Sequence, residues 1–377
     1  MNKKNWTLGV TLFSMFFGAG NLIFAPFMGA QAGSRTPLTL IGFLVAAVIL
    51  PITAIVTIAP YGSAKNMISR IYKPLGPIFV TLIYLLIGPC IAIPRTASTS
   101  YEMWTWLISD NLAARILYIL VFFGAAMVLA FHPGKLKDIL GKILGPILLV
   151  LVAFVALPAL FHPGLIAYPA SGWASSPLLK GLNEGYQTMD ILAAFCFGLI
   201  FMLNIQQAKV KNEKKTFLVS ACIAGGLLAV VYTLLSISSM LQSASLQSCS
   251  NGAEVLSVMA GETWGNWGQL LCGLIFLIAC INVCAGLLAS CSEYFCLLFP
   301  KIAYRAWLIL FALAGAVMAC FGLQSILSWS GTLLSWICPI AILFLVTGWI
   351  KRPKTGKSFA AVTGTGKTTK SAPAKKA

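Results

Sequence analysis

The chain has 377 residues, of which 59% are hydrophobic and only 9% are charged, and its mean hydropathy is +0.90. Soluble globular domains carry about 25% charged residues, so this composition excludes a soluble fold and predicts an integral membrane protein. The formal charge of +17 suggests nucleic-acid binding only in a soluble protein.

Ten apolar runs are long enough to cross a bilayer as helices, because about 20 apolar residues span a hydrocarbon core of about 30 Å. The runs are too long and continuous for the strands of a membrane barrel. Charged residues and helix-breaking Pro and Gly residues mark the ends of these runs. We expect an all-α polytopic protein with helices near 7–29, 37–60, 75–95, 113–131, 139–160, 186–207, 217–240, 267–296, 303–322 and 326–349.

The basic residues predict how these helices are oriented. If the N-terminus is cytoplasmic, most Lys and Arg residues before residue 351 fall on the cytoplasmic side, as the positive-inside rule requires. The cytoplasmic set is Lys3, Lys4, Lys65, Arg70, Lys73, Lys135, Lys137, Lys142, Lys209, Lys211, Lys214, Lys215, Lys301 and Arg305. The external set is Arg35, Arg95, Arg115 and Lys180. We therefore expect a multi-pass protein of the inner (plasma) membrane with both termini in the cytoplasm.

The first span contains the stretch FFGAGNLIFAPF, residues 16–27, which places Gly and Pro in the middle of an expected helix. Glycine costs a helix interior about 1 kcal/mol and proline about 3 kcal/mol. Two half-helices that meet inside a membrane offer free N–H groups to a carboxylate and free C=O groups to an ammonium or sodium ion. Close helix packing explains the glycines but not the Asn followed by Pro. We predict an unwound substrate site at Gly18, Ala19, Gly20 and Asn21.

The third span is interrupted at IGPCIAIPRTASTSYEM, residues 87–103, which contains Arg95 and Glu102. One interpretation is a simple Gly-Pro kink with Arg95 capping the external end of the helix. The other is that Arg95 and Glu102 belong to a gate or transport pathway. Asp190, near the start of the sixth span, is a third candidate, because ionisable groups at the membrane margin are often functional.

Five spans before and five after the external segment 162–185 imply an inverted repeat, because five is an odd number. We expect a transporter core over 1–350, with repeats near 7–160 and 186–349, and an interfacial or re-entrant piece in the segment between them. The counterpart of the first helix is then the sixth span, DILAAFCFGLIFMLN, where we predict a second, weaker interruption with an apolar wall. The candidate residues there are Ala194, Phe195, Cys196, Phe197 and Gly198.

Cofactors and nucleotides are not expected. The eleven Cys residues lie almost entirely in the apolar runs, which suits packing better than disulfides or metal binding. The segment 351–377 is Lys-rich and is predicted to be a disordered cytoplasmic tail. Its GTGKTT resembles the end of a phosphate-binding loop, but Ala361 stands where that motif requires its first Gly. Neither a nucleotide nor a nucleic acid is therefore expected as a partner; the lipid bilayer is.

Four stretches resemble, in chain order, segments of the branched-chain amino acid:cation symporter family, the BrnQ-type carriers. They are LFSMFFGAGNLIFAPF followed by QAG, YLLIGPCIAIPRTASTSYEM, GYQTMDILAAFCFG and the run ending SCSEYF, and they extend over residues 1 to about 350. The resemblance implies the leucine-transporter (APC) type fold with its five-plus-five inverted repeat. It also implies uptake of leucine, isoleucine and valine by symport with Na⁺ or, less often, with protons.

The resemblance also implies roles for particular residues. The family's first-helix motif falls on residues 18–21, which are expected to bind the substrate carboxylate, with Gly18 and Asn21 also serving the ion. Its sixth-helix motif falls on residues 193–198, which are expected to hold the substrate side chain. Its eighth-helix segment falls on residues 282–290, where Asn282 and Ser290 are the polar candidates for a sodium site.

This chain departs from the family pattern in two places. Hydroxyl side chains are expected where the eighth span has Leu288 and Ala289, so proton coupling stays open as an alternative. The family usually continues into two further helices where this chain has its Lys-rich tail, so a shortened and impaired member is a second alternative. A carrier for another hydrophobic amino acid is the third.

Other classes of membrane protein fit less well. A membrane-embedded enzyme needs a nucleophile with its base, or a set of metal ligands, but the chain has only two His residues and no GxSxG or HExxH motif. A channel needs a polar or charged ring along a continuous pore, and the spans lack polar faces. We therefore expect a transporter rather than an enzyme.

Overall fold

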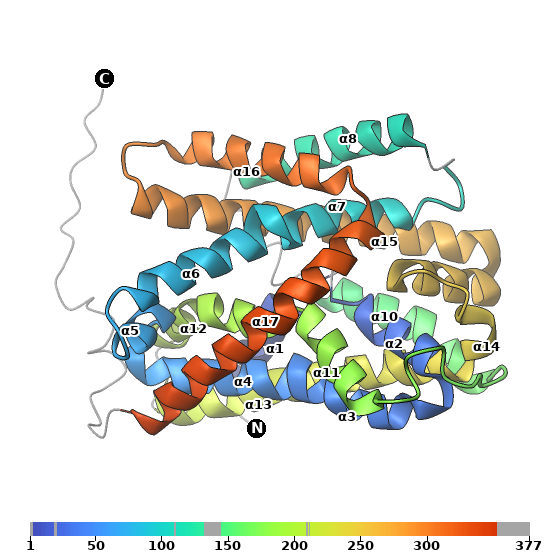
Figure 1. Ribbon diagram of the computed structural model, residues 1–377, viewed down its shortest axis with the longest axis horizontal. Coiled ribbons are helices and arrows are strands. Elements are labelled where there is room, and N and C mark those ends of the chain that lie inside the picture. The colour runs from blue at the N-terminus through green and yellow to red at the C-terminus, as the bar shows by residue number, and fades with distance from the viewer. Residues whose placement is uncertain are drawn as a thin grey trace.

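The computed structural model describes residues 3–18, 21–108, 111–131, 145–208, 210 and 212–352. The described part is helical, without strands, and most helices run along the long axis of the molecule (Figure 1). The helices are α1 (Lys3–Phe16), α2 (Phe24–Ala32), α3 (Thr36–Leu44), α4 (Leu50–Ile58), α5 (Ala64–Ser69), α6 (Leu75–Leu85), α7 (Ala92–Glu102), α8 (Leu112–Ala130), α10 (Gly145–Phe161), α11 (Pro177–Gln187), α12 (Asp190–Gln207), α13 (Glu213–Leu241), α14 (Ser243–Leu246), α15 (Gly252–Leu298), α16 (Tyr304–Ala319) and α17 (Leu323–Ile350).

Every one of the ten expected spans overlaps at least one of these helices. Within the described residues, six helical stretches are long and apolar enough to cross a membrane, and two shorter apolar helices accompany them. The six are Phe24–Tyr61, Leu75–Glu102, Leu112–Ala130, Glu213–Leu241, Gly252–Leu298 and Leu323–Ile350. The chain is a multi-pass membrane protein.

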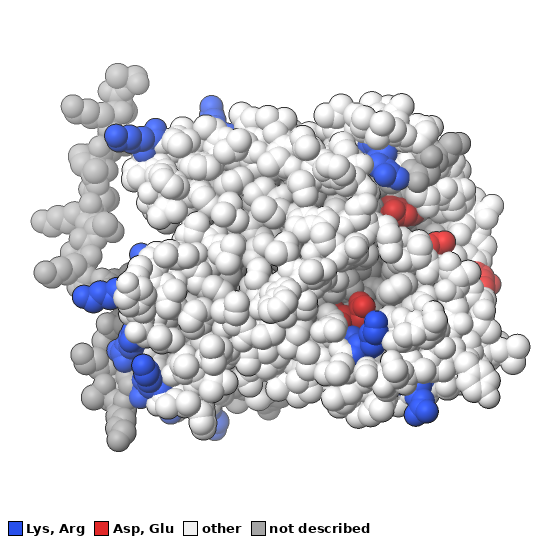
Figure 2. Space-filling model, viewed as in Figure 1, with Lys and Arg blue, Asp and Glu red and all other residues white. Residues whose placement is uncertain are grey.

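Charged side chains lie toward the two ends of the molecule. On the face shown in Figure 2, Lys and Arg lie at the left end and also toward the right, where all visible Asp and Glu lie, and the belt between the two ends is largely uncharged. An uncharged belt is what the hydrocarbon core of a bilayer requires. The orientation of the chain in the membrane stays a prediction.

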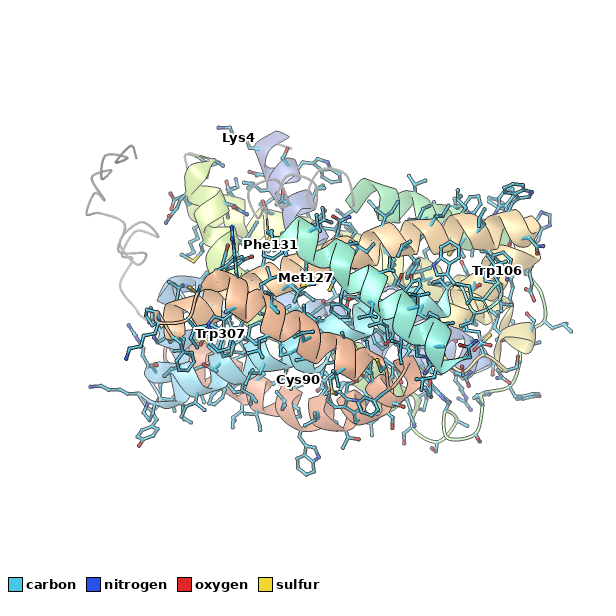
Figure 3. The ribbon with its side chains drawn as sticks, turned by 90° about the horizontal axis from the view of Figure 1, so that it is seen from above. Lys4, Cys90, Trp106, Met127, Phe131 and Trp307 are labelled. Atoms are coloured by element: carbon cyan, nitrogen blue, oxygen red, sulfur yellow. The ribbon has the colours of Figure 1, made fainter. Side chains whose placement is uncertain are left out.

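Helices α8 and α16 form one side of the molecule (Figures 1 and 3). Val121 on α8 and Val317 on α16 are more than 60% exposed. Trp307 and Phe311 of α16 turn the other way and pack against Phe295 of α15, with ring centroids 5.0 and 5.1 Å away. This side therefore presents an apolar surface to the lipid.

The first span is interrupted, as the sequence predicts. Helix α1 ends at Phe16 and α2 begins at Phe24. Between them the Asn21 N–H donates to the Gly18 carbonyl at 2.9 Å, which forms a turn instead of a continued helix. Ala19 and Gly20 lie outside the described residues.

The sixth span is interrupted at a different place from the one predicted. Helix α12 is continuous from Asp190 to Gln207, so the interruption expected within residues 193–198 is wrong. The chain breaks instead at Thr188 and Met189, between α11 and α12. Met189 has φ of 62°, a left-handed conformation that costs a side-chain-bearing residue of order 1–3 kcal/mol and recurs at functional sites.

The third span also deviates from a regular helix. A π-helical turn at Leu86–Cys90 separates α6 from α7, and Gly88 in that turn has non-helical ψ of −121°. A Cβ atom at Gly88 would lie 2.8 Å from the Cys291 sulfur of α15. The glycine therefore permits the close approach of α15 to this kink, and the span continues to Glu102, beyond the predicted end at residue 95.

Helix α11 is held against α3 by a close crossing of small residues. A Cβ atom on Gly181 would lie 1.8 Å from the Thr39 carbonyl oxygen, and one on Gly42 would lie 2.1 Å from the Leu178 oxygen. Small residues at such crossings allow backbones to approach and pack in membranes. This crossing fixes the half-helix that leads into the second interruption.

Candidate functional site

The two interruptions lie next to each other. The Asn21 side-chain amide in the first break donates to the Asp190 carboxylate at 2.7 Å, and it also donates to the Phe16 carbonyl at 2.8 Å. Asn21 therefore caps the end of α1 and joins it to the first residue of α12. Of the predicted site residues, the structure brings these two into direct contact.

Asp190 is almost fully buried, at 2% exposed. Its other oxygen accepts a hydrogen bond from the Tyr232 hydroxyl of α13 at 3.3 Å, and its backbone N–H donates to the Thr188 hydroxyl at 3.4 Å. Taking a carboxylate out of water costs several kcal/mol unless it is paired and hydrogen-bonded. These three donors and acceptors hold Asp190 at the junction of both breaks.

Arg95 of α7 lies at the other side of this junction and is 3% exposed. Its Nη1 donates to the Gln187 carbonyl at the end of α11 at 2.7 Å, and its guanidinium lies 5.1 Å from the centre of the Phe24 ring at the start of α2. A cation over an aromatic face gains about 2 kcal/mol or more when desolvated. Arg95 therefore connects α7 to the helices that begin or end at the two breaks.

The Gln187 side chain extends the connection to α17. It donates to the Leu327 carbonyl at 3.2 Å and accepts from the Ser330 hydroxyl at 3.0 Å. Arg95, Phe24 and Gln187 thus join α7, α2, α11 and α17 in one packed contact, which we call the Arg95–Phe24–Gln187 contact.

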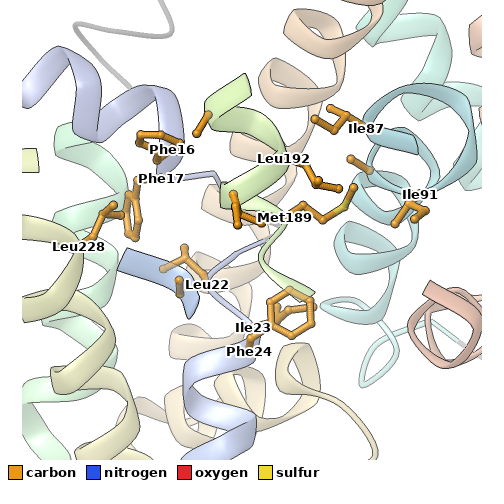
Figure 4. Packing of buried hydrophobic residues seen from close by; sticks show 14 of the residues in the cluster. Phe16, Phe17, Leu22, Ile23, Phe24, Ile87, Ile91, Met189, Leu192 and Leu228 are labelled. Carbon is orange, nitrogen blue, oxygen red and sulfur yellow. The ribbon is translucent and has the colours of Figure 1, made fainter. Parts of the chain in front are cut away.

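Apolar side chains surround the breaks. Figure 4 shows Phe16, Phe17 and Leu22 on the side of the first break and Met189 and Leu192 on the side of the second. Ile87 and Ile91, from the kinked part of the third span, complete the cluster (Figure 4). Such a wall suits an aliphatic side chain.

The predicted residues of α12 divide between two environments. Phe197 faces the first break, because its ring lies 5.7 Å from that of Phe16. Phe195 packs instead on Phe79 of α6, and a Cβ on Gly198 would be 3.4 Å from Ile58 of α4. Ala194 is fully buried and Cys196 partly buried. The substrate-wall role of this set stays a prediction.

The predicted ion residues are less closely grouped. Val283 of α15 faces Gly18, because a Cβ on that glycine would be 3.5 Å from the valine side chain. Ser290 lies seven residues, or two helical turns, further along the same face, and it is exposed. Asn282 is buried, and its amide donates to the Ile278 carbonyl of its own helix at 2.8 Å. A sodium site at these residues stays a prediction.

Glu102, the remaining gating candidate, is the last residue of α7 and is partly buried. It lies seven residues beyond Arg95, which is about 10 Å along a helix. The structure therefore separates it from the Arg95–Phe24–Gln187 contact. Ala19 and Gly20, predicted to bind the substrate carboxylate, lie outside the described residues.

Sequence reasoning missed Tyr232 and Gln187 as functional candidates. Tyr232 is fully buried in an apolar span, and the phenol hydroxyl of a mid-span tyrosine needs a polar partner. Gln187 stands three residues before Asp190 within the GYQTMD stretch. Two signals in the sequence could have identified them: the hydroxyl of Tyr232 within an apolar span, and the amide of Gln187 close in sequence to the Asp190 carboxylate.

The sequence matches the family described as "Branched-chain amino acid transport protein" over residues 1–366. A branched-chain amino acid permease BrnQ of Bacillus subtilis is 36% identical over 360 residues, which cover 93% of this chain and 82% of the relative. A branched-chain amino acid permease BrnQ of Corynebacterium glutamicum is 38% identical over 345 residues, which cover 91% and 80%.

Solved structures show the fold. MhsT in complex with L-phenylalanine superposes with a TM-score of 0.63 at 14% identity, covering 96% of this chain and 94% of that chain. Mhp1, a nucleobase-cation-symport-1 family transporter, superposes with a TM-score of 0.56 at 17% identity, covering 90% and 77%. The chain has the leucine-transporter type fold. By its sequence, it belongs to the branched-chain amino acid transport protein family.

Proposed function

We propose that this chain is a secondary transporter that imports leucine, isoleucine and valine by symport with Na⁺. The observation that carries the proposal is the pair of interrupted helices, joined across their breaks by the Asn21–Asp190 hydrogen bond of 2.7 Å. The relatives named as branched-chain amino acid permeases support the substrate class.

The geometry offers a partner to each end of a zwitterion. Helix α2 presents its N-terminus to the first break, and backbone N–H groups at a helix N-terminus favour a carboxylate. The carbonyl end of α1 and the Asp190 carboxylate favour an ammonium group. Phe16 and Phe197, whose rings lie 5.7 Å apart, offer apolar surface to the aliphatic side chain.

The proposed sodium site lies between the first break and α15. Gly18 faces α15 at Val283, so carbonyl oxygens of the break are the ligands we propose, since sodium prefers oxygen. Ser290, about 10 Å further along α15, is too far from Gly18 to share the same ion. Leu288 and Ala289 are buried and supply no hydroxyl. For that reason a proton is the second candidate for the coupling ion, with Asp190 as its acceptor.

Access to the site in this conformation differs between the two ends. On the face of α15 toward Gly18, Phe276 and Cys280 are fully buried, Val283 is partly buried and Ser290 is exposed. The Arg95–Phe24–Gln187 contact closes the opposite direction. We interpret this as a state closed at the end of α2 and open at the end of α1, as alternating access requires.

Leucine uptake into proteoliposomes tests the function. We expect saturable uptake that rises with an inward Na⁺ gradient and is abolished when K⁺ replaces Na⁺. Uptake that does not depend on Na⁺ but depends on a proton gradient would show that the transporter is coupled to protons instead. The absence of saturable leucine, isoleucine or valine flux would reject the substrate class.

A charge-neutralising variant tests the binding geometry. Asp190→Asn keeps the size of the side chain but removes the anion proposed to bind the ammonium group, so we expect the KM for leucine to rise by about tenfold or more. Asp190→Asn protein with normal KM and normal kcat would show that the carboxylate is not a substrate ligand.

A further inference from the structure

A small hollow borders the Arg95–Phe24–Gln187 contact and does not include Asn21 or Asp190 in its lining. It has a volume of about 180 Å³, enough for several water molecules because one needs about 10–15 Å³ of such space. Its lining includes Phe24, Phe27, Glu184, Ser250, Leu327 and Ser328. The hollow is therefore formed by α2, α11, α17 and the start of α15.

The lining combines one carboxylate with apolar and hydroxyl groups. Glu184 of α11 is partly buried, whereas Ser328 of α17 is exposed. Lys180, one turn before Glu184, lies over the Trp173 ring at 5.9 Å. One carboxylate is too few for a divalent cation, which takes six or more oxygen ligands. An ammonium group that carries an aliphatic chain matches this lining better.

The hollow and the central site share a wall. Phe24 and Gln187 line the hollow, and both contact Arg95 on their other side. Phe24 is only 3% exposed, and neither Arg95 nor the Asn21–Asp190 pair lines the hollow.

We propose that the hollow is an outer binding site for an aliphatic amino acid, in which the Glu184 carboxylate binds the ammonium group and Phe27 and Leu327 contact the side chain. The identity of this ligand rests on the transport function proposed above. The site holds the substrate before the Arg95–Phe24–Gln187 contact opens toward the central site.

The test is the protection of an introduced thiol in the purified full-length chain in detergent. Ser328→Cys places a thiol in the lining, and Gln324→Cys, one turn earlier on α17, is a second reporter. Maleimide modification at each position is read by peptide mass. We expect saturating leucine to slow the modification about tenfold by mass action, and 4-methylpentanoate, which lacks the ammonium group, to have no effect.

Matched carboxylate variants identify the ligand group. Adding Glu184→Gln to the reporter should abolish protection, whereas Glu262→Gln, which neutralises an exposed carboxylate of α15 outside the lining, should preserve it. The native Cys249 contributes little background, because burial, reinforced by Glu254 and Glu262, raises the pKa of its thiol to about 12.

The outcomes separate this site from the transport function. Leucine uptake without protection would reject the outer site and leave the function standing. Protection without uptake would keep the site and reject the function. Protection that survives Glu184→Gln, or a lack of modification at both reporters, would also overturn the proposal.

Discussion

The Asn21 side chain links two groups, one on each side of the junction between the breaks. Its amide bonds the Phe16 carbonyl and the Asp190 carboxylate, and it is 7% exposed. The sequence predicts a polar role for this residue because Asn within an apolar span needs a partner. It does not predict the partner, since Asp190 is 169 residues away.

Removing this amide should damage both stability and transport. Asn21→Ala leaves two buried acceptors unsatisfied, so we expect the free energy of unfolding to fall by about 1–3 kcal/mol or more, because one acceptor is charged. Leucine uptake per folded molecule should also fall sharply. Thermal unfolding in detergent and proteoliposome uptake measure the two effects.

The matched control is Asn183→Ala, which removes the same group from an exposed position on α11. It should leave unfolding and uptake near the wild-type values. An Asn21→Ala chain that melts and transports like Asn183→Ala would show that the amide is dispensable.

At the scale of elements, the interruption of the first span can be predicted from the sequence, whereas the interruption of the sixth span at Thr188 and Met189 cannot. Gly and Pro in FFGAGNLIFAPF carry a direct helix penalty, so the break of the first span is predictable. Thr188 and Met189 carry no comparable signal. Their break depends on tertiary contacts, namely the α3–α11 crossing and the hydrogen bonds around Asp190. The Gly198 signal in α12 reflects packing on Ile58 instead.

The crossing of α3 and α11 should be intolerant of a single methyl group. Gly181→Ala would place a Cβ atom 1.8 Å from the Thr39 carbonyl oxygen, so the helices must separate and the second break must shift. We expect a lower melting temperature and reduced leucine uptake.

Gly124→Ala in α8 is the appropriate comparison, because its new Cβ atom meets nothing within 4 Å. The substitution should be neutral or stabilising by up to about 1 kcal/mol, the helix propensity difference between the two residues. Equal effects of both substitutions on melting and uptake would contradict the importance of the crossing.

At the scale of the whole molecule, hydropathy predicts where apolar helices lie, whereas the number of ten spans stays a prediction, because six stretches of the described residues are long and apolar enough to cross a membrane. It does not reveal α11, because that half-helix contains Lys180, Asn183 and Glu184 and is short. The substrate class also comes from family resemblance rather than from apolar patterning. The conformation is beyond sequence reasoning, because it depends on which of two packed arrangements is favoured.

The open end of the molecule can be tested with a thiol at Ser290. In the described state this residue is exposed while Phe276 on the same helix face is fully buried. Ser290→Cys should therefore react readily with maleimide, and leucine with Na⁺ should change its rate by shifting the population of the two states. Phe276→Cys should stay unreactive in the absence of substrate. Equal reaction at both positions would contradict the asymmetric access.

The central claim is that the facing breaks form the substrate site, and a cryo-EM structure with saturating leucine and Na⁺ tests it most directly. The account predicts leucine density between the end of α1 and the start of α2, with the ammonium group near Asp190 and the side chain toward Phe197. Leucine bound elsewhere, with the space between the breaks filled by protein side chains, would contradict the claim.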